Sequence, residues 1–247
     1  MQSTPAKENV PAMPAEDTQD HPPQTAKAPG LLRWLTPAAC LFALAGYFAP
    51  WVDNRVAGLV ITGLDLGEYV KFLPAVRNGV ISIWRQGFYI PLVAVSLSCS
   101  LIAYRRVWRF ALPVKLALLL IAAVAALNML PPAWSPAVLA APEFRLQTMC
   151  ITLCLAALAF SPFLGLLPAL AAYAPILLLS LAGIWLPVSG LLIVLPDIQS
   201  LYRTPLAPGW GIYLMVIGLA GLAVSSVLGI RRERISDGRR LHNGAHN

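Results

Sequence analysis

The stretch that decides the fold is residues 147–196, QTMCITLCLAALAFSPFLGLLPALAAYAPILLLSLAGIWLPVSGLLIVLP, which contains no charged residue. A helix needs about 20 apolar residues to cross the ~30 Å hydrocarbon core of a bilayer, so this stretch is long enough for two spans. Its internal helix breakers are Pro162, Gly165 and Pro168. We therefore predict a tight reversal there, with a fourth span over about 147–166 and a fifth over about 170–195. A re-entrant hairpin is the alternative for this region.

The rest of the chain has the same apolar character. Of its 247 residues, 58% are hydrophobic and only 12% are charged, whereas a soluble domain carries about a quarter charged residues. This composition excludes a disordered regulator and argues against a water-soluble enzyme. Further apolar blocks predict spans over about 34–52, 88–104, 110–130 and 210–230. The predicted fold class is all-α: a polytopic transmembrane helical bundle of about six spans, occupying residues 31–230.

The two ends of the chain differ from the bundle in composition. Residues 1–30 contain six prolines and almost no large apolar side chain, so we expect a disordered, Pro-rich tail. Residues 231–247 form a basic tail, which can attract anionic lipid headgroups. Binding of nucleic acid is not expected from such a short basic run. The segment before the first apolar block is long and contains acidic residues, which favours a retained first span over a cleaved signal peptide.

The positions of lysine and arginine predict the orientation in the membrane, because cytoplasmic connections carry the excess of these residues. The denser set comprises Lys27, Arg33, Arg105, Arg106, Arg109, Lys115, Arg231, Arg232, Arg234, Arg239 and Arg240. The sparser set comprises Arg55, Lys71, Arg77, Arg85, Arg145 and Arg203. We expect the first set, and with it both termini, to be cytoplasmic. The expected location is the plasma membrane, and the composition is compatible with a bacterial inner membrane.

The predicted fifth span contains residues that disturb a regular helix: Gly183, Trp185, Pro187 and Gly190. Proline removes one helical hydrogen bond, so we expect a bend, and in lipid the freed carbonyl must find another partner. Such a bend either frames a cavity or is only a packing adjustment.

The predicted sixth span carries small residues every four positions, at Gly221, Ser225 and Gly229. They share one face of a helix and allow another backbone to approach closely. The simpler interpretation is packing within the bundle, and the alternative is docking to another membrane subunit.

The outer loop, residues 53–87, holds most of the polar candidates. Asp65 and Glu68, three residues apart, indicate a helix start, and the apolar residues that follow predict a short amphipathic helix over about 66–73. The candidate binding or interaction residues are Asp65, Glu68, Lys71, Arg77 and Arg85. The simpler interpretation is an interfacial helix whose charges are solvated, with Glu68 and Lys71 pairing across one turn.

Motifs for catalysis or cofactors are absent from the sequence. Histidine occurs only at positions 21, 242 and 246, which argues against a bilayer haem or an HExxH zinc site. The sequence has no P-loop and no GxSxG, and the four cysteines lie in apolar blocks without CxxC spacing. We therefore expect no metal, no cofactor and no enzymatic activity. The expected function is that of a non-catalytic subunit or accessory component of a membrane complex. Alternatives are a small-solute permease or a membrane-embedded substrate-binding component and, third, a lipid-modifying enzyme using the acids of the outer loop.

Overall fold

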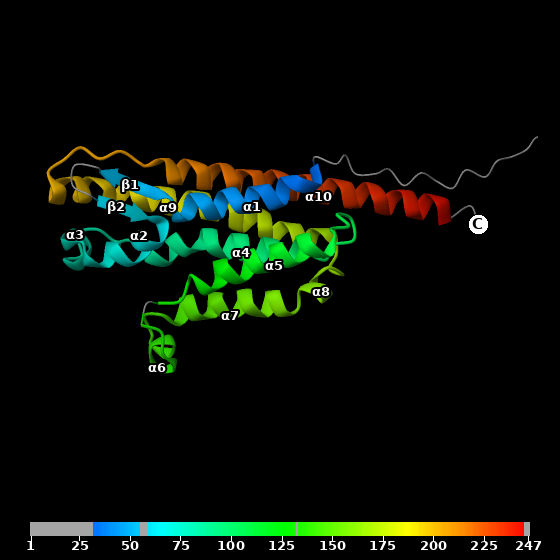
Figure 1. The fold of residues 1–247 in the computed structure, drawn as a ribbon, viewed down its shortest axis with the longest axis horizontal. Coiled ribbons are helices and arrows are strands. Elements are labelled where there is room, and N and C mark those ends of the chain that lie inside the picture. The colour runs from blue at the N-terminus through cyan, green and yellow to red at the C-terminus, as the bar shows by residue number, and fades with distance from the viewer. Residues whose placement is uncertain (1–31, 55–58, 132, 245–247) are drawn as a thin grey trace, which may run out of the picture.

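The computed structural model describes residues 32–54, 59–131 and 133–244, so the predicted tail over 1–30 lies outside the described residues. The described chain is mostly helical, as predicted. Long helices lie side by side and run alternately in opposite directions, with the connections at the two ends of the bundle (Figure 1). Their bounds are α1 Leu32–Phe48, α4 Ile90–Ile102, α5 Leu112–Leu127, α7 Arg145–Ala159, α9 Ala169–Tyr202 and α10 Trp210–Gly244.

Three segments of the described chain are both long and apolar enough to cross a membrane, which supports a membrane protein. They are Arg85–Ile102, Ala169–Tyr202 and Trp210–Ile235. Helices α5 and α7 are apolar but shorter, with 16 and 15 residues. Large apolar side chains remain exposed along the outside of the bundle, as expected for a surface that faces lipid rather than water. Examples are Leu112, Leu116, Leu120, Met149, Leu153, Leu178, Leu181, Leu192 and Ile217.

Small residues bring the backbones of α1 and α10 into direct contact. A Cβ atom added at Gly218 would lie 2.2 Å from the backbone nitrogen of Ala43, and one added at Gly46 would lie 2.2 Å from the backbone nitrogen of Met215. No side chain fits between backbones at such distances. The first and last long helices of the chain are therefore packed as a close pair.

The outer loop contains a β-hairpin that the all-α prediction missed. Strand β1, Pro50–Asn54, pairs antiparallel with β2, Leu59–Thr62. The hairpin also meets the connection before α10, where Val52 bridges to Pro208 and the Gly209 amide donates to the Trp51 carbonyl at 2.7 Å. The predicted span over 34–52 was consequently too long, because the chain leaves the helix after Phe48 and its last residues form a strand.

The short helix of the outer loop exists, but its start was misplaced. Helix α2, Gly63–Tyr69, begins after Thr62, and it continues as a 3-10 turn, η1, Val70–Phe72. Thr62 and Asp65 form a reciprocal capping box, so Asp65 is the third residue of the helix rather than its cap. Pro74 then opens a further short helix, α3, Pro74–Arg77, because proline is well tolerated in a first turn.

The later helices extend beyond their predicted ends. Helix α9 continues past residue 195 to Tyr202 with three prolines inside it, and it ends at Arg203, whose φ of 52° is left-handed. Helix α10 continues past residue 230 to Gly244, so most of the predicted tail over 231–247 is helical. The predicted span over 147–166 is divided into α7 and the short helix α8, Ser161–Leu164.

The remaining described elements lie between the long helices. The 3-10 turn η2, Arg85–Tyr89, leads into α4, and helix α6, Pro136–Ala140, lies between α5 and α7. In Figure 1, α6 lies at the same end of the bundle as β1, β2, α2 and α3. We use the term outer cap for β1, β2, α2, η1 and α3 together with residues 78–84, 133–144 and 203–209.

We predict that Gly218→Ala destabilises the protein by about 1–3 kcal/mol, the usual cost of overpacking, because the new methyl group meets the backbone of α1. Ala220→Val is the matched control: it enlarges an exposed residue of the same helix and should change stability by about 0.5 kcal/mol or less. The measurement is unfolding of the purified proteins in mild detergent. Equal stability of Gly218→Ala and the wild type would contradict the close backbone pairing.

Candidate functional site

The carboxylate of Glu68 is the centre of a polar cluster at the outer end of the bundle. Its Oε2 atom accepts a hydrogen bond from Lys71 Nζ at 2.6 Å, and its Oε1 atom accepts one from the Tyr89 hydroxyl at 2.7 Å. A Cβ at Gly67 would lie 3.2 Å from the Tyr89 ring, so the glycine allows α2 to pack tightly on this ring. The cluster thus joins the outer loop to the start of the α4 segment.

The protonation of Glu68 reflects these contacts. Burial acts to raise the pKa of the carboxyl group, but the hydrogen bonds from Lys71 and Tyr89 and the charges of Lys71 and Arg85 outweigh it. The pKa of Glu68 therefore lies below its ordinary value, and the side chain is ionised at neutral pH.

Arg85 connects this cluster to a distant part of the chain. Its Nη1 atom lies 3.9 Å from Glu68 Oε2 and 3.0 Å from Glu143 Oε1, and its Nη2 atom donates to the Glu143 carbonyl at 3.3 Å. Its guanidinium also lies over the Phe144 ring, 5.0 Å from the ring centre. Only about 10% of the Arg85 side chain is exposed, whereas Glu143 is largely exposed. Arg85 therefore holds the segment before α7 against the outer loop.

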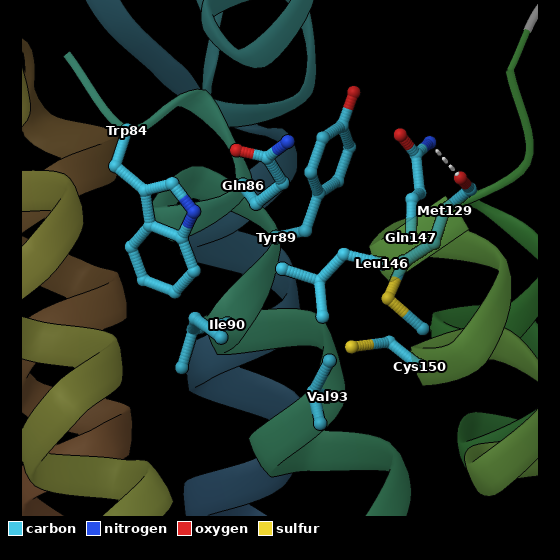
Figure 2. Close-up of a pocket in the computed structure, with 9 residues that line it drawn as sticks. All are labelled: Trp84, Gln86, Tyr89, Ile90, Val93, Met129, Leu146, Gln147 and Cys150. Atoms are coloured by element: carbon cyan, nitrogen blue, oxygen red, sulfur yellow. Dashed lines mark hydrogen bonds between the residues drawn. The ribbon is translucent and has the colours of Figure 1, made fainter. Parts of the chain in front are cut away.

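Two cavities flank this cluster. The larger, about 240 Å³, is lined by charged and apolar side chains: Val70, Lys71, Val76, Ile83, Arg85 and Gln86. The smaller, about 100 Å³, has almost entirely apolar walls, and Figure 2 shows the side chains around it. Its lining residues are Trp84, Gln86, Tyr89, Ile90, Val93, Met129, Leu146, Gln147 and Cys150. The two cavities share Gln86.

The structure gathers three of the five outer-loop candidates, Glu68, Lys71 and Arg85, in this cluster. Asp65 belongs to the capping box with Thr62. Arg77 is exposed on α3 and lines neither cavity. The sequence analysis did not identify Tyr89, Glu143 or Gln147, because their partners are far away in the chain.

The two candidate glycines of α9 pack against other elements of the bundle. A Cβ at Gly183 would lie 3.5 Å from the backbone of Pro91, and one at Gly190 would lie 2.7 Å from the Phe88 ring. Pro187 is buried, whereas Trp185 is 71% exposed on the outside of the bundle. None of the four lines either cavity described above, and Gly183 and Gly190 are the two that let α9 pack closely on α4 and η2.

The small residues of α10 face other helices of the same chain. Gly221 faces the Cβ of Ala39 on α1, at 3.1 Å from an added Cβ, and Gly229 faces the ring of Tyr173 on α9, at 2.5 Å. Ser225 is buried and donates to the carbonyl of Leu222 at 2.9 Å. These positions match the interpretation as packing within the bundle.

A second polar cluster, not predicted from the sequence, lies at the opposite end of the bundle. Arg105 and Glu233 form a two-pronged ion pair, with Arg105 Nε donating to Glu233 Oε1 at 2.8 Å and Nη2 donating to Oε2. Tyr173 donates to Glu233 and accepts from Trp108 Nε1 at 2.9 Å. Arg105 and Glu233 are only 4% and 9% exposed. Removing one partner of such a buried pair leaves an uncompensated charge, which makes this cluster a structural connection between α9, α10 and the end of α4.

A signal for this cluster was present in the sequence. Glu233 is the first acidic residue after the last apolar block, it stands between Arg232 and Arg234, and it lies four residues after Gly229. It therefore continues the face formed by Gly221, Ser225 and Gly229. Because the sequence analysis assigned Glu233 to the basic tail, it did not recognise that Glu233 lies on the same helix face as these small residues.

The outer site combines charged side chains with an apolar cavity. Within the described residues, no group of three or more His, Cys, Asp or Glu side chains is placed to hold a metal ion. Lys71, Arg85 and Glu68 offer charged hydrogen-bonding groups, and the small cavity offers apolar walls. No protein-family model, no curated protein and no solved structure matches the chain.

The lowered pKa of Glu68 predicts how its contribution depends on pH. The pKa of a glutamate in the unfolded chain is about 4.3, and the pKa of Glu68 in the folded protein is lower. Above about pH 4.3 the ionised Glu68 therefore contributes its full stabilisation to the folded state. This contribution is lost as the pH falls through the pKa of the folded protein. At pH 7 we expect Glu68→Gln to be less stable than the wild type by about 1 kcal/mol. The difference should shrink below about pH 4 and disappear in stronger acid.

Thermal unfolding of both proteins across this pH range measures the difference. Asp53→Asn is the matched control, because it removes the charge of an exposed carboxylate that lies outside the Glu68 cluster. If the stability of Glu68→Gln relative to the wild type is the same from pH 7 to pH 3, the charge of Glu68 does not stabilise the cluster.

Proposed function

We propose that this chain is a six-span protein of the plasma membrane, in bacteria the inner membrane, with both termini in the cytoplasm. In this proposal it acts as a non-catalytic subunit or accessory component of a membrane complex. The outer cap is the part that contacts the other component. Two kinds of support follow, one for the membrane topology and one for the role of the cap.

The six spans are supported by the arrangement of α1, α4, α5, α7, α9 and α10. These helices alternate in direction, and the arginine- and lysine-rich connections come at one end of the bundle (Figure 1). Helix α4 has only 13 residues, but it continues directly from η2, and the segment Arg85–Ile102 has 18 residues. The shortest of the other five, α7, has 15 residues and is about 23 Å long. A bilayer can adapt to such a short helix by local thinning at a modest cost.

The observation that carries the proposed role is the construction of the outer cap. Arg85 bridges to Glu143, and the Gly209 amide donates to Trp51, so connections from three parts of the chain are fixed to one another. The cap nevertheless leaves large apolar side chains exposed, including Phe72, Val80 at 78% exposure, and Trp134. An ordered surface with exposed apolar side chains is typical of a contact with another protein.

A second candidate function is a small-solute permease or a substrate-binding component. It is favoured by the cavity of about 240 Å³, where Lys71 and Arg85 could bind an anionic group of a solute. The two functions differ in what is lost when the cap is altered: assembly in the first, and solute binding in the second.

We predict the following labelling pattern for the proposed topology. Single cysteines replacing Asn78, Ala137 and Ala207, all exposed in the outer cap, should react with a membrane-impermeant maleimide in intact cells. Arg106→Cys, exposed at the opposite end, should react only after the cells are lysed. The wild-type chain with its own cysteines gives the background. Labelling of Arg106→Cys in intact cells, or protection of the three cap positions, would rule out the proposed orientation.

We predict that the protein purified in mild detergent carries another polypeptide in a fixed ratio. Val80→Glu places a charge in the exposed apolar surface of the cap. The matched control, Asn78→Glu, adds the same charge without removing an apolar side chain. We expect Val80→Glu to release at least ten times more of the bound polypeptide than Asn78→Glu does. For each variant, native mass spectrometry measures the mass of the purified protein with any bound polypeptide, and thermal unfolding measures its stability. A wild-type chain that is always alone, or equal effects of the two variants, would contradict the role as a subunit.

A further inference from the structure

The connection between α4 and α5, residues 103–111, carries positive charge at the end of the bundle opposite the outer cap (Figure 1). Arg106 and Arg109 of this connection are both exposed. Arg105 differs from them, because it is buried and its charge is compensated by Glu233. Within the described chain, neither Arg106 nor Arg109 forms an ion pair with a carboxylate. The connection therefore presents positive charge that the protein itself does not neutralise.

Two neighbouring helices add a cation each to this connection. The Lys115 ammonium of α5 lies over the Tyr104 ring, 4.9 Å from its centre, and the Arg232 guanidinium of α10 lies over the Trp108 ring at 5.7 Å. Both rings belong to the connection, and attraction between a cation and an aromatic face holds the two charges beside it. Among the described residues, no carboxylate pairs with either cation. Positive charges from three elements thus meet at one place.

An exposed apolar face of α5 begins directly after this connection. Its residues recur every three or four positions and so share one side of the helix. They are Leu112, Leu116, Leu120, Val124 and Leu127, with exposures between 37% and 66%. A phospholipid has the same two parts in the same order, a charged phosphate followed by acyl chains that lie along an apolar surface.

Other exposed apolar faces of the bundle lack these cations. Helices α7 and α9 also expose large apolar side chains, including Leu153, Leu178 and Leu181. The connection between these two helices, residues 160–168, contains no charged residue. Charged and uncharged phospholipids therefore meet α7 and α9 on equal terms, whereas the cations beside α5 favour a headgroup with net negative charge.

We propose that the α4–α5 connection and the exposed face of α5 form a binding site for an anionic phospholipid. Its phosphate lies among Arg106, Arg109 and Lys115, and an acyl chain lies along the exposed leucines of α5. A zwitterionic lipid brings its own cation against the cluster and binds more weakly. The site rests on the proposed six spans, since α5 must cross the bilayer, but it does not depend on the role as a subunit.

The test uses the full chain in lipid nanodiscs that contain one of two photoreactive lipids, a phosphatidylglycerol or a phosphatidylcholine with the same diazirine-bearing acyl chain. Adducts are mapped by mass spectrometry. We expect the ratio of phosphatidylglycerol to phosphatidylcholine adducts to be at least about fivefold higher on α5 than on α7, which corresponds to about 1 kcal/mol, the contribution of one cation near the membrane surface.

The same map separates the two ways in which the proposal can fail. Equal ratios on α5 and α7 would leave the six spans in place and overturn the lipid site. If neither lipid labels the exposed face of α5 while α9 is labelled, α5 does not face the bilayer, and both the six spans and the lipid site are wrong.

Variants test which charges bind the headgroup. In Arg106→Gln/Lys115→Gln, the adduct ratio on α5 should fall to the value found on α7. Arg77→Gln/Arg145→Gln is the matched control, because it removes two exposed arginines at the outer end of the bundle and should leave the ratio on α5 unchanged. If both double variants lower the ratio equally, only the total charge of the protein matters, and the proposed site is wrong.

Two measurements on the wild-type chain keep the test valid if a variant is poorly folded. Raising NaCl from about 0.05 M to about 0.5 M shortens the screening length and should lower the preference for phosphatidylglycerol on α5. A preference that does not change with salt would contradict recognition by charge. Inorganic phosphate should compete no better than sulfate at equal ionic strength. Stronger competition by phosphate would show that the cluster binds phosphate from water rather than a lipid.

Discussion

The close approach of α1 and α10 is the constraint on which the rest of the structure depends. Lipid is as apolar as leucine, so helices in a membrane gain little from hiding apolar surface and associate through close packing instead. Gly218 and Gly46 allow the two backbones to touch. Because these helices come from opposite ends of the chain, their contact closes the bundle, and it also brings the connection before α10 to the hairpin of the outer cap.

Polar clusters then fix the two ends of the packed helices. At the outer end, Glu68 and Arg85 join the cap to η2 and to the segment before α7. At the other end, Arg105 and Glu233 join the end of α4 to α10, with Tyr173 of α9 beside them. Hydrogen bonds of this kind depend on direction and distance, whereas apolar contacts tolerate small sliding. The clusters therefore define how far each helix is displaced along its neighbours.

The sequence predicted the helices better than it predicted the site. The apolar blocks and the breakers Pro162, Gly165 and Pro168 located the start of each long helix within a few residues, because helix formation depends on neighbours in the chain. The ends of α9 and α10 were predicted too early. The hairpin was missed because Pro50–Asn54 continues an apolar block, and only its pairing with Leu59–Thr62 and Pro208 makes it a strand. The polar clusters were missed in part, since Glu68 and Tyr89 are 21 residues apart, and Arg105 and Glu233 are 128 apart.

The sequence by itself determined that this chain is helical and apolar enough for a membrane, and that small residues lie every four positions on its last long helix. These properties follow from composition and from periodicity, which are local. Only the tertiary structure decided which helix those small residues face, which charges are buried as pairs, and which side chains line the cavities at the outer end. Such properties depend on distances between remote segments, and no pattern along a single sequence encodes them directly.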